Sequence, residues 1–163
     1  MTALILVDAA GYPLESQSVP IGFRIARVPG LNQLMQSILP RGVIESSLRN
    51  TYGDPSRVTP QLVDRYYELT LREGNRTALA QRFAAGRHAT DTARIQQLRL
   101  PTLILWGGRD RLIPPQYGDQ FHRDITGSRM VTFPELGHVP HEEDPQATVA
   151  SVRQFLRQPA SGS

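Results

Sequence analysis

The stretch that decides the fold is residues 102–110, which have the sequence TLILWGGRD. Its first five residues form a short run of mostly apolar side chains, which predicts a strand buried on both faces of a parallel sheet. The glycines Gly107 and Gly108 allow a tight turn after the strand. Asp110 is therefore expected just past the carboxyl end of this strand, where functional groups gather in open α/β sheets.

Two similar runs stand on either side of this stretch. Residues 4–7 (LILV) end in the turn signal DAAGYP, and residues 130–133 (MVTF) are followed by PELGH. Residues 4–7 are also predicted to form a strand buried on both faces, as in a parallel sheet. Such a strand needs a neighbour on each of its edges.

Helices are predicted around these strands. Pro114 and Pro115 open a helix that runs through residue 125, and Asp144 with Pro145 starts the last helix. The apolar face of the last helix is formed by Val149, Val152, Phe155 and Leu156. The order strand, helix, strand, helix predicts a parallel sheet with right-handed crossovers.

The stretch between the first two strands is predicted to be helical with breaks. Thr59 is expected to cap one of its helices and Asn75 the next. Proline, glycine and capping signals delimit helices over residues 29–39, 43–49, 60–74, 76–83 and 91–98. We therefore predict a core strand segment at 1–13, a helical lid at 14–98, a C-terminal core at 99–158 and a frayed tail at 159–163.

Two ionisable side chains follow neighbouring predicted strands. Asp110 comes just after one strand, and His138 comes just after the next. A carboxylate beside an imidazole can fix its tautomer and stabilise the imidazolium, which makes a general base. The alternatives are a turn carboxylate for Asp110 and a surface imidazole for His138. Asp8, which ends the first strand, is read chiefly as a turn residue.

These loops resemble those of the α/β-hydrolase-fold superfamily. Residues 105–114 (LWGGRDRLIP) are similar to its acid loop, residues 137–145 (GHVPHEEDP) to its histidine loop, and residues 4–12 to the strand before its lid. The resemblance covers nearly the whole chain. It implies an α/β fold with a partial parallel α/β-hydrolase sheet, made of three C-terminal strands, and a helical lid insertion.

The resemblance also implies roles for single residues. Family triads run nucleophile, acid, histidine in chain order, which assigns Asp110 as the acid and His138 as the base. Some members place the acid where Asp8 stands. Leu112 and Val139 flank the two loops and are candidate substrate-binding residues, with an ordinary core role equally open.

The chain departs from the family pattern in one respect. It contains no Gly-x-Ser-x-Gly motif, the elbow that carries the nucleophilic serine. We therefore expect the N-terminal half of the fold, with the nucleophile and the oxyanion donors, to be missing here or to come from a partner. This chain alone is expected to be inactive.

The favoured function is the hydrolysis of small ester-like substrates by a Ser-Asp-His triad whose serine is not in this chain. One alternative is an epoxide hydrolase or dehalogenase with an aspartate nucleophile, in which a lid tyrosine, Tyr66 or Tyr67, polarises the oxirane oxygen. Core packing of these tyrosines is the default reading. Another alternative is a non-catalytic remnant or binding module.

Composition restricts the other function classes. The chain has no cysteine, which excludes disulfides and thiol nucleophiles, and its 18 basic residues are all arginines scattered along the sequence. A nucleic-acid partner is not expected, because these residues form no basic block. Neither a metal nor a cofactor is expected, and no apolar run is long enough for a membrane span. The expected partner is a small-molecule substrate; the oligomeric state is open, and a cytoplasmic location is favoured.

Overall fold

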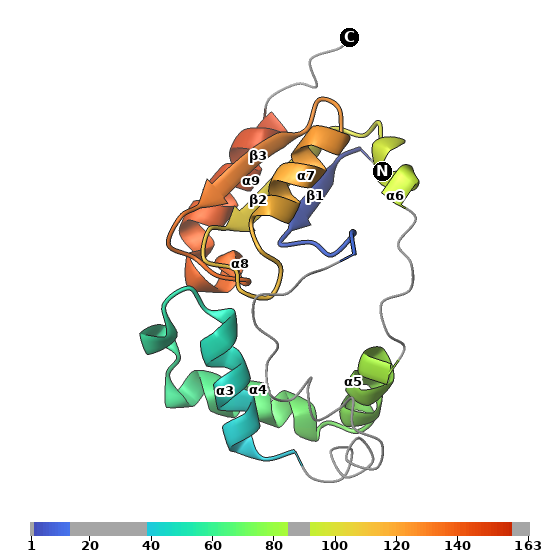
Figure 1. Cartoon of the computed structure of the whole chain (residues 1–163). Helices are drawn as coiled ribbons and strands as arrows, with labels where there is room; N and C mark the ends of the chain where they lie inside the picture. Colours follow the sequence, from blue (N-terminus) through green and yellow to red (C-terminus); the bar gives the residue numbers. More distant parts are fainter. Residues whose placement is uncertain (1, 14–38, 85–91, 158–163) are drawn as a thin grey trace.

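The computed structural model of the protein describes residues 2–13, 39–84 and 92–157 (Figure 1). It contains a parallel sheet of three strands, β1 (Leu4–Val7), β2 (Thr102–Gly107) and β3 (Arg129–Phe133), in the order β1-β2-β3. In the strand register, Leu4 pairs with Thr102 and Leu103 pairs with Arg129. The predicted α/β class with a three-stranded parallel sheet is confirmed.

Helices precede and follow the second and third strands. In chain order, the helices among the described residues are α3 (Arg41–Thr51), the 3₁₀ turn η1 (Pro55–Arg57), α4 (Pro60–Leu71), α5 (Asn75–Ala84), α6 (Thr92–Gln96), α7 (Gln116–Asp124), α8 (Pro140–Glu143) and α9 (Pro145–Arg157). We call α3 to α6 the helical insertion, because they lie between β1 and β2. The helix predicted over residues 29–39 falls almost entirely outside the described residues.

The central strand β2 separates two layers of helices. Its side chains alternate between the two faces of the sheet, so Ile104 and Trp106 share one face and Leu103 and Leu105 the other. The first pair packs with α7, whereas α9 lies on the opposite face (Figure 1). All six residues of β2 are buried, as the sequence predicts for a strand in the middle of a parallel sheet.

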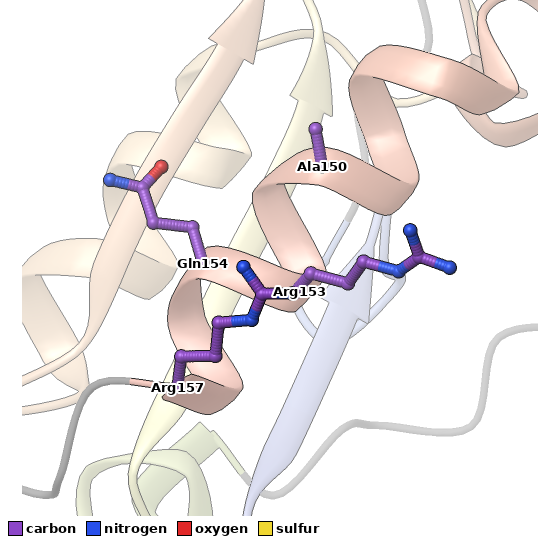
Figure 2. A pocket seen from close by; sticks show the side chains of 4 residues that line it. All are labelled: Ala150, Arg153, Gln154 and Arg157. Atoms are coloured by element: carbon purple, nitrogen blue, oxygen red, sulfur yellow. The ribbon is translucent and has the colours of Figure 1, made fainter.

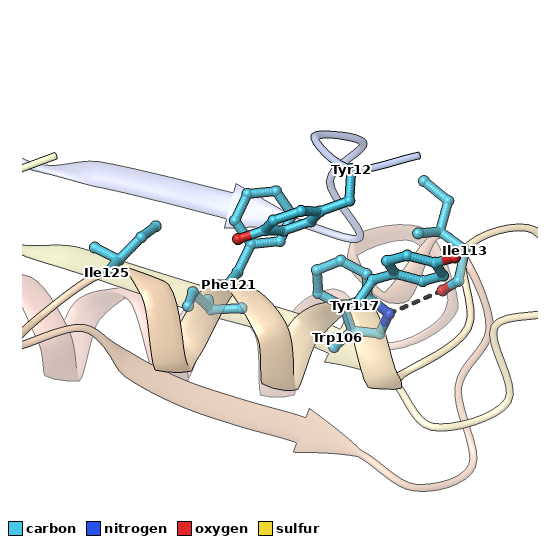
Figure 3. Packing of buried hydrophobic residues seen from close by; sticks show 7 residues of the cluster. Tyr12, Trp106, Ile113, Tyr117, Phe121 and Ile125 are labelled. Carbon is cyan, nitrogen blue, oxygen red and sulfur yellow. Dashed lines mark hydrogen bonds between the residues drawn. The ribbon is translucent and has the colours of Figure 1, made fainter. Parts of the chain in front are cut away.

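The main core lies between the sheet and α7 (Figure 3). Trp106 is fully buried, and its indole Nε1 donates a hydrogen bond to the carbonyl oxygen of Ile113 at 3.0 Å. This bond ties the end of β2 to the loop that carries Asp110. The rings of Tyr12 and Phe121 meet edge to face with centroids 4.7 Å apart, which packs the turn after β1 against α7.

The helical insertion has an apolar cluster of its own, formed by Leu48, Tyr52, Val58 and Val63. The predicted N-cap of α4 is confirmed, since the Thr59 hydroxyl accepts a hydrogen bond from the backbone N–H of Leu62 at 3.2 Å. The prediction that Asn75 caps the next helix is wrong. Asn75 is the first residue of α5, and its side chain donates to the carbonyl oxygen of Leu69 near the end of α4.

One expectation about burial is wrong. The strand β1 is only half buried, because within the described residues it pairs with β2 alone and its other edge has no partner strand. The apolar face of α9 is also partly uncovered, with Val149 45% and Leu156 61% exposed. Both features lie where the described part of the chain places no further layer.

A membrane-crossing helix is not found among the described residues, since none of their helices combines the required length with sufficient apolarity.

Candidate active site

The two side chains singled out in the sequence lie together at the carboxyl ends of β2 and β3. Nδ1 of His138 lies 2.8 Å from Oδ2 of Asp110. The side chain of Asp110 is fully buried, whereas that of His138 is 27% exposed. The predicted contact between a carboxyl group and an imidazole is therefore present, in the geometry of a strong hydrogen bond.

The Asp110 loop holds this carboxyl group in a fixed position. Oδ1 accepts hydrogen bonds from the backbone N–H groups of Leu112 and Ile113, at 2.8 and 3.0 Å. This is the turn role that the sequence left open for Asp110, and it uses one oxygen only. The second oxygen remains for His138, so the side chain shapes its own loop and contacts the imidazole at once.

The hydrogen bond decides the tautomer of His138. A carboxylate that accepts from three N–H groups has no proton to give, so Nδ1 of His138 carries the hydrogen and Nε2 is free to accept one. Burial by itself lowers the pKa of His138, but the hydrogen bond to Asp110 and the charge of Asp110 outweigh it, and the net pKa is raised; the charge of Asp8, when that group is ionised, raises it further. The ring is thus built to take up a proton at Nε2 and to be stabilised when charged.

Asp8 joins this pair, although the sequence indicated chiefly a turn residue. It ends β1, is 4% exposed, and accepts a hydrogen bond from the backbone N–H of Gly107 at 2.8 Å. The only sequence signal for Asp8 was its place at the end of a strand. Its contact with the site comes from the pairing of β1 with β2, whose residues lie far apart in the sequence.

Asp8, Asp110 and His138 could together be considered for a metal, since one ligand atom of each lies within 4.8 Å of the others. The donor set argues against it. Both oxygens of Asp110 already accept N–H donors, and Nδ1 of His138 is itself one of them. A cation would have to displace these bonds, so we assign no metal here.

The candidate substrate-binding residues Leu112 and Val139 are both half buried. Leu112 packs against the main core and Val139 against the cluster of the helical insertion. These contacts favour packing roles, and a role in binding substrate stays a prediction. Of the other histidines, His122 contacts the hydroxyl of Ser128 and His141 lies exposed in α8; His88 falls outside the described residues.

The histidine loop is joined directly to the helical insertion. The backbone N–H of His138 donates to the carbonyl oxygen of Thr51 at 2.8 Å. Gly137 and Gly53 approach so closely that a Cβ on Gly137 would stand 2.5 Å from the backbone nitrogen of Gly53 and 2.3 Å from the oxygen of Thr51. The backbone position of His138 therefore depends on residues about ninety positions earlier in the chain.

Glu143 also stabilises this contact between the histidine loop and the insertion. Its side chain is buried, and its two oxygens accept from the backbone N–H groups of Gly137 at 2.7 Å and Gly53 at 2.9 Å. One carboxylate thus holds both glycine loops. Nothing in the sequence pattern pointed to a contact between Glu143 and Gly53.

The neighbouring Glu142 receives the hydroxyl groups of two tyrosines from the insertion. Tyr66 donates to Oε1 at 2.6 Å and Tyr52 to Oε2 at 3.1 Å. Burial, and next the nearby Glu142 carboxylate, raises the pKa of both tyrosines, so both remain protonated donors. The hydroxyl of Tyr66 is therefore committed to the loop that follows His138.

We expect the substitution Glu143→Gln to destabilise the protein. A glutamine amide can accept from one of the two backbone N–H groups, but its NH₂ group then faces the other, which is left buried without a partner. The expected cost is about 1–3 kcal/mol of unfolding free energy, which chemical denaturation would measure. Glu142→Gln is the matched control and should cost less, because its tyrosine partners are only part-buried. Equal losses in both variants would contradict the bridging role of Glu143.

A hollow on the described surface lies elsewhere. It has a volume of about 400 Å³ and is lined by Ala150, Arg153, Gln154 and Arg157 of α9 (Figure 2). These residues stand on one face of a single helix and include none of the site residues. The hollow is therefore separate from this site.

Comparison with protein families identifies the pattern. A family model described as the alpha/beta hydrolase family matches residues 1–152. Among curated proteins, a pimeloyl-[acyl-carrier protein] methyl ester esterase of Neisseria meningitidis is 31% identical over 95 residues, which is 58% of this chain and 37% of that protein. An uncharacterized hydrolase of Bacillus subtilis is 21% identical over 94% of this chain and 56% of that protein.

Solved structures show the same fold. A meta-cleavage product hydrolase from Pseudomonas fluorescens superposes with a TM-score of 0.75 and 20% identity, over 95% of this chain and 55% of that one. An esterase from Thermogutta terrifontis superposes with a TM-score of 0.73 and 22% identity, over 98% of this chain and 57% of that one. At these identities the likeness is one of fold. The chain spans about half the length of these proteins.

Proposed function

The chain belongs to the alpha/beta hydrolase family, and from this premise we propose that it carries the acid and the base of a serine hydrolase that cleaves small ester-like substrates. The observation that carries the proposal is the 2.8 Å contact between His138 Nδ1 and Asp110 Oδ2 at the ends of adjacent parallel strands. Residues of this kind in this place serve as base and orienting acid.

In the proposed reaction a serine hydroxyl attacks the ester carbonyl. Nε2 of His138 accepts the serine proton as the new oxygen–carbon bond forms, and the buried Asp110 carboxylate stabilises the resulting imidazolium. His138 then gives that proton to the departing alkoxide, which leaves as an alcohol. A water molecule repeats the attack on the acyl-enzyme, with His138 again taking and returning a proton.

We propose that the serine and the oxyanion donors come from a segment outside this chain. The sequence has no Gly-x-Ser-x-Gly elbow, and the chain spans only about half of its relatives. Two surfaces are suited to receive further strands and helices. One is the edge of β1 that has no partner strand among the described residues, and the other is the exposed apolar face of α9 that includes Val149 and Leu156.

The helical insertion is proposed to act as the lid of the site. Its helices α3 and α4 lie beyond the carboxyl ends of the strands, and the insertion contacts the histidine loop through Thr51 and Gly53 (Figure 1). A lid in this place would shape the substrate pocket and limit the access of water.

The ester class is supported by relatives whose names describe esterases, from N. meningitidis and T. terrifontis. The epoxide-hydrolase alternative needs a lid tyrosine with a free hydroxyl, but the hydroxyl of Tyr66 donates to Glu142. That engagement disfavours Tyr66 as a group that polarises an oxirane oxygen. No observation on the described residues favours a non-catalytic binding module over the hydrolase.

The proposal is tested by reconstitution. This chain is mixed with a segment that carries the nucleophile strands of the fold, and hydrolysis of p-nitrophenyl acetate is followed after size-exclusion chromatography has shown assembly. We expect activity in the assembled mixture and none from this chain alone. An assembled but inactive mixture, or esterase activity of this chain alone that His138→Ala leaves intact, would overturn the proposal.

A further inference from the structure

One buried carboxyl group beside the proposed base and acid has no part in the reaction above. Asp8 buries its side chain at the end of β1, and Oδ1 accepts from the backbone N–H of Gly107. Its second oxygen, Oδ2, is buried without a hydrogen-bond partner. A buried carboxyl oxygen left in this way carries a substantial desolvation cost, so its protonation state needs an explanation.

The backbone at Asp8 is held in an unusual conformation to place this group. Its φ angle is 41°, and Asp8 is the only residue other than glycine with a positive φ among the described residues. Such a conformation is unfavourable for a residue with a Cβ atom and persists where the surroundings demand it. The surroundings here are the Asp110 loop on β2 and the His138 loop on β3, and these supply the charged groups that face Asp8.

Two buried carboxylates at this distance repel each other when both are ionised, even with an imidazole beside them. Asp110 is the member suited to be charged, because it accepts three N–H hydrogen bonds. Asp8 accepts only one, from Gly107, and has a like charge beside it. Burial in the first place, with Asp110 as a further cause, raises the pKa of Asp8 to about 8. The arrangement is that of paired carboxyl groups in which one keeps its proton.

We infer that Asp8 is a positioning residue that stands beside Asp110 as a neutral carboxylic acid and donates its proton, from Oδ2, in a hydrogen bond to the Asp110 carboxylate. This proton satisfies the orphaned oxygen of Asp8. It also gives the Asp110 carboxylate a fourth donor, which restricts its rotation and keeps Oδ2 of Asp110 directed at Nδ1 of His138. No covalent bond forms or breaks, and the proton stays on Asp8.

The consequence for the reaction rests on the proposed function, whereas the protonation state does not. A neutral Asp8 leaves Asp110 as the single negative charge facing His138. If Asp8 were ionised, a second negative charge would raise the pKa of His138 further and hold it in the protonated form, in which it cannot accept the serine proton. Asp8 thus keeps a carboxyl group beside His138 without over-stabilising the imidazolium.

The substitution Asp8→Asn tests the inference directly. Asparagine tolerates the positive φ, its carbonyl can still accept from Gly107, and its NH₂ group donates as the protonated acid does. The ring of His138 is titrated by NMR in this chain, without need of the nucleophile or of any activity. We expect the titration midpoint of His138 to match that of the wild type, and an inflection at a pH of about 8, caused by Asp8, to be lost.

A second measurement uses the pH dependence of stability. The folded pKa of Asp8, about 8, lies above its unfolded value of 3.8, so folding prefers the proton and burial of Asp8 destabilises the protein increasingly between these pH values. The free energy of unfolding of Asp8→Asn should therefore exceed that of the wild type by more at pH 8 than at pH 5. Asp119→Asn, the same change on the exposed surface of α7, should show a difference that does not vary in this way.

Two results would overturn the inference. One is a clearly lowered pKa of His138 in Asp8→Asn, which would show that a negative charge has been removed. The other is a stability difference that is constant with pH. In the assembled hydrolase, Asp8→Asn should retain activity within a few-fold of the wild type, whereas Asp8→Ala, which cannot donate, should lose more. If the assembled mixture is inactive but the NMR titration gives the expected result, the proposed function is wrong and the role of Asp8 is still supported.

Discussion

Substitution of His138 by alanine is expected to lower kcat of the assembled hydrolase by roughly 10⁴- to 10⁶-fold. The imidazole is the only group among the described residues placed to exchange a proton at the ends of the strands while a buried carboxylate stabilises its charged form. Without it the serine keeps its proton and attacks as a neutral alcohol. The loss should appear in kcat rather than in KM, because proton transfer belongs to the transition state.

The matched control is His141→Ala, three residues further on and exposed in α8. It removes the same side chain from the same loop region but should leave kcat within a few-fold of the wild type. Circular dichroism would show that both variants keep the fold. Full activity in His138→Ala, or equal losses in the two variants, would show that the base lies elsewhere.

The sheet and most described helices could be predicted from the sequence, because their signals are local. The apolar run of β2, the proline pair before α7 and the capping threonine of α4 each act within a few residues. Burial of β1 on both faces was predicted wrongly for the opposite reason. Apolar side chains such as Leu6 show that a strand can be buried, but not whether the described chain supplies the neighbours that would bury it.

The site shows the same difference between local signals, which the sequence carries, and contacts between distant residues, which it does not. Asp110 and His138 could be paired from the sequence, because both follow strands that are consecutive in the chain and adjacent in the sheet. Asp8 reaches the site across the pairing of β1 with β2, about one hundred residues away. A sequence pattern fixes the turn that Asp8 makes but not the carboxylate that it faces, so its burial and charge could not be foreseen.

The junction of Glu143 with Gly137 and Gly53 has a functional meaning beyond stability. The backbone N–H groups of Gly137, in the histidine loop, and of Gly53, just after α3, both donate to the one buried carboxylate of Glu143. A displacement of α3 would therefore also displace the backbone of His138, because the carbonyl oxygen of Thr51 accepts its N–H. We expect any opening of the proposed lid to occur further from Gly53, because the part of the insertion nearest the site is hydrogen-bonded to the histidine loop and to Glu143.

The substitution Asp110→Asn should be nearly as damaging as loss of the imidazole. The amide oxygen can still accept from Leu112 and Ile113 and so keep the loop intact, but the NH₂ group then faces Nδ1 of His138. Two donors cannot pair, so His138 adopts the tautomer with its hydrogen on Nε2, where it cannot accept a proton from serine. Loss of the correct tautomer is expected to lower kcat by about 10⁴-fold.

A titration separates this mechanism from general damage to the fold. Asp110 raises the pKa of His138, so Asp110→Asn should lower that pKa in NMR spectra of this chain. The sign matters for stability as well. His138 gains a partner when the protein folds, which stabilises the folded state below the unfolded histidine pKa of 6.5 and is lost as the pH rises through the folded pKa. Asp110→Asn should therefore lose more stability in acid than above neutral pH. An unchanged His138 titration in Asp110→Asn would mean that the carboxylate does not act on the imidazole.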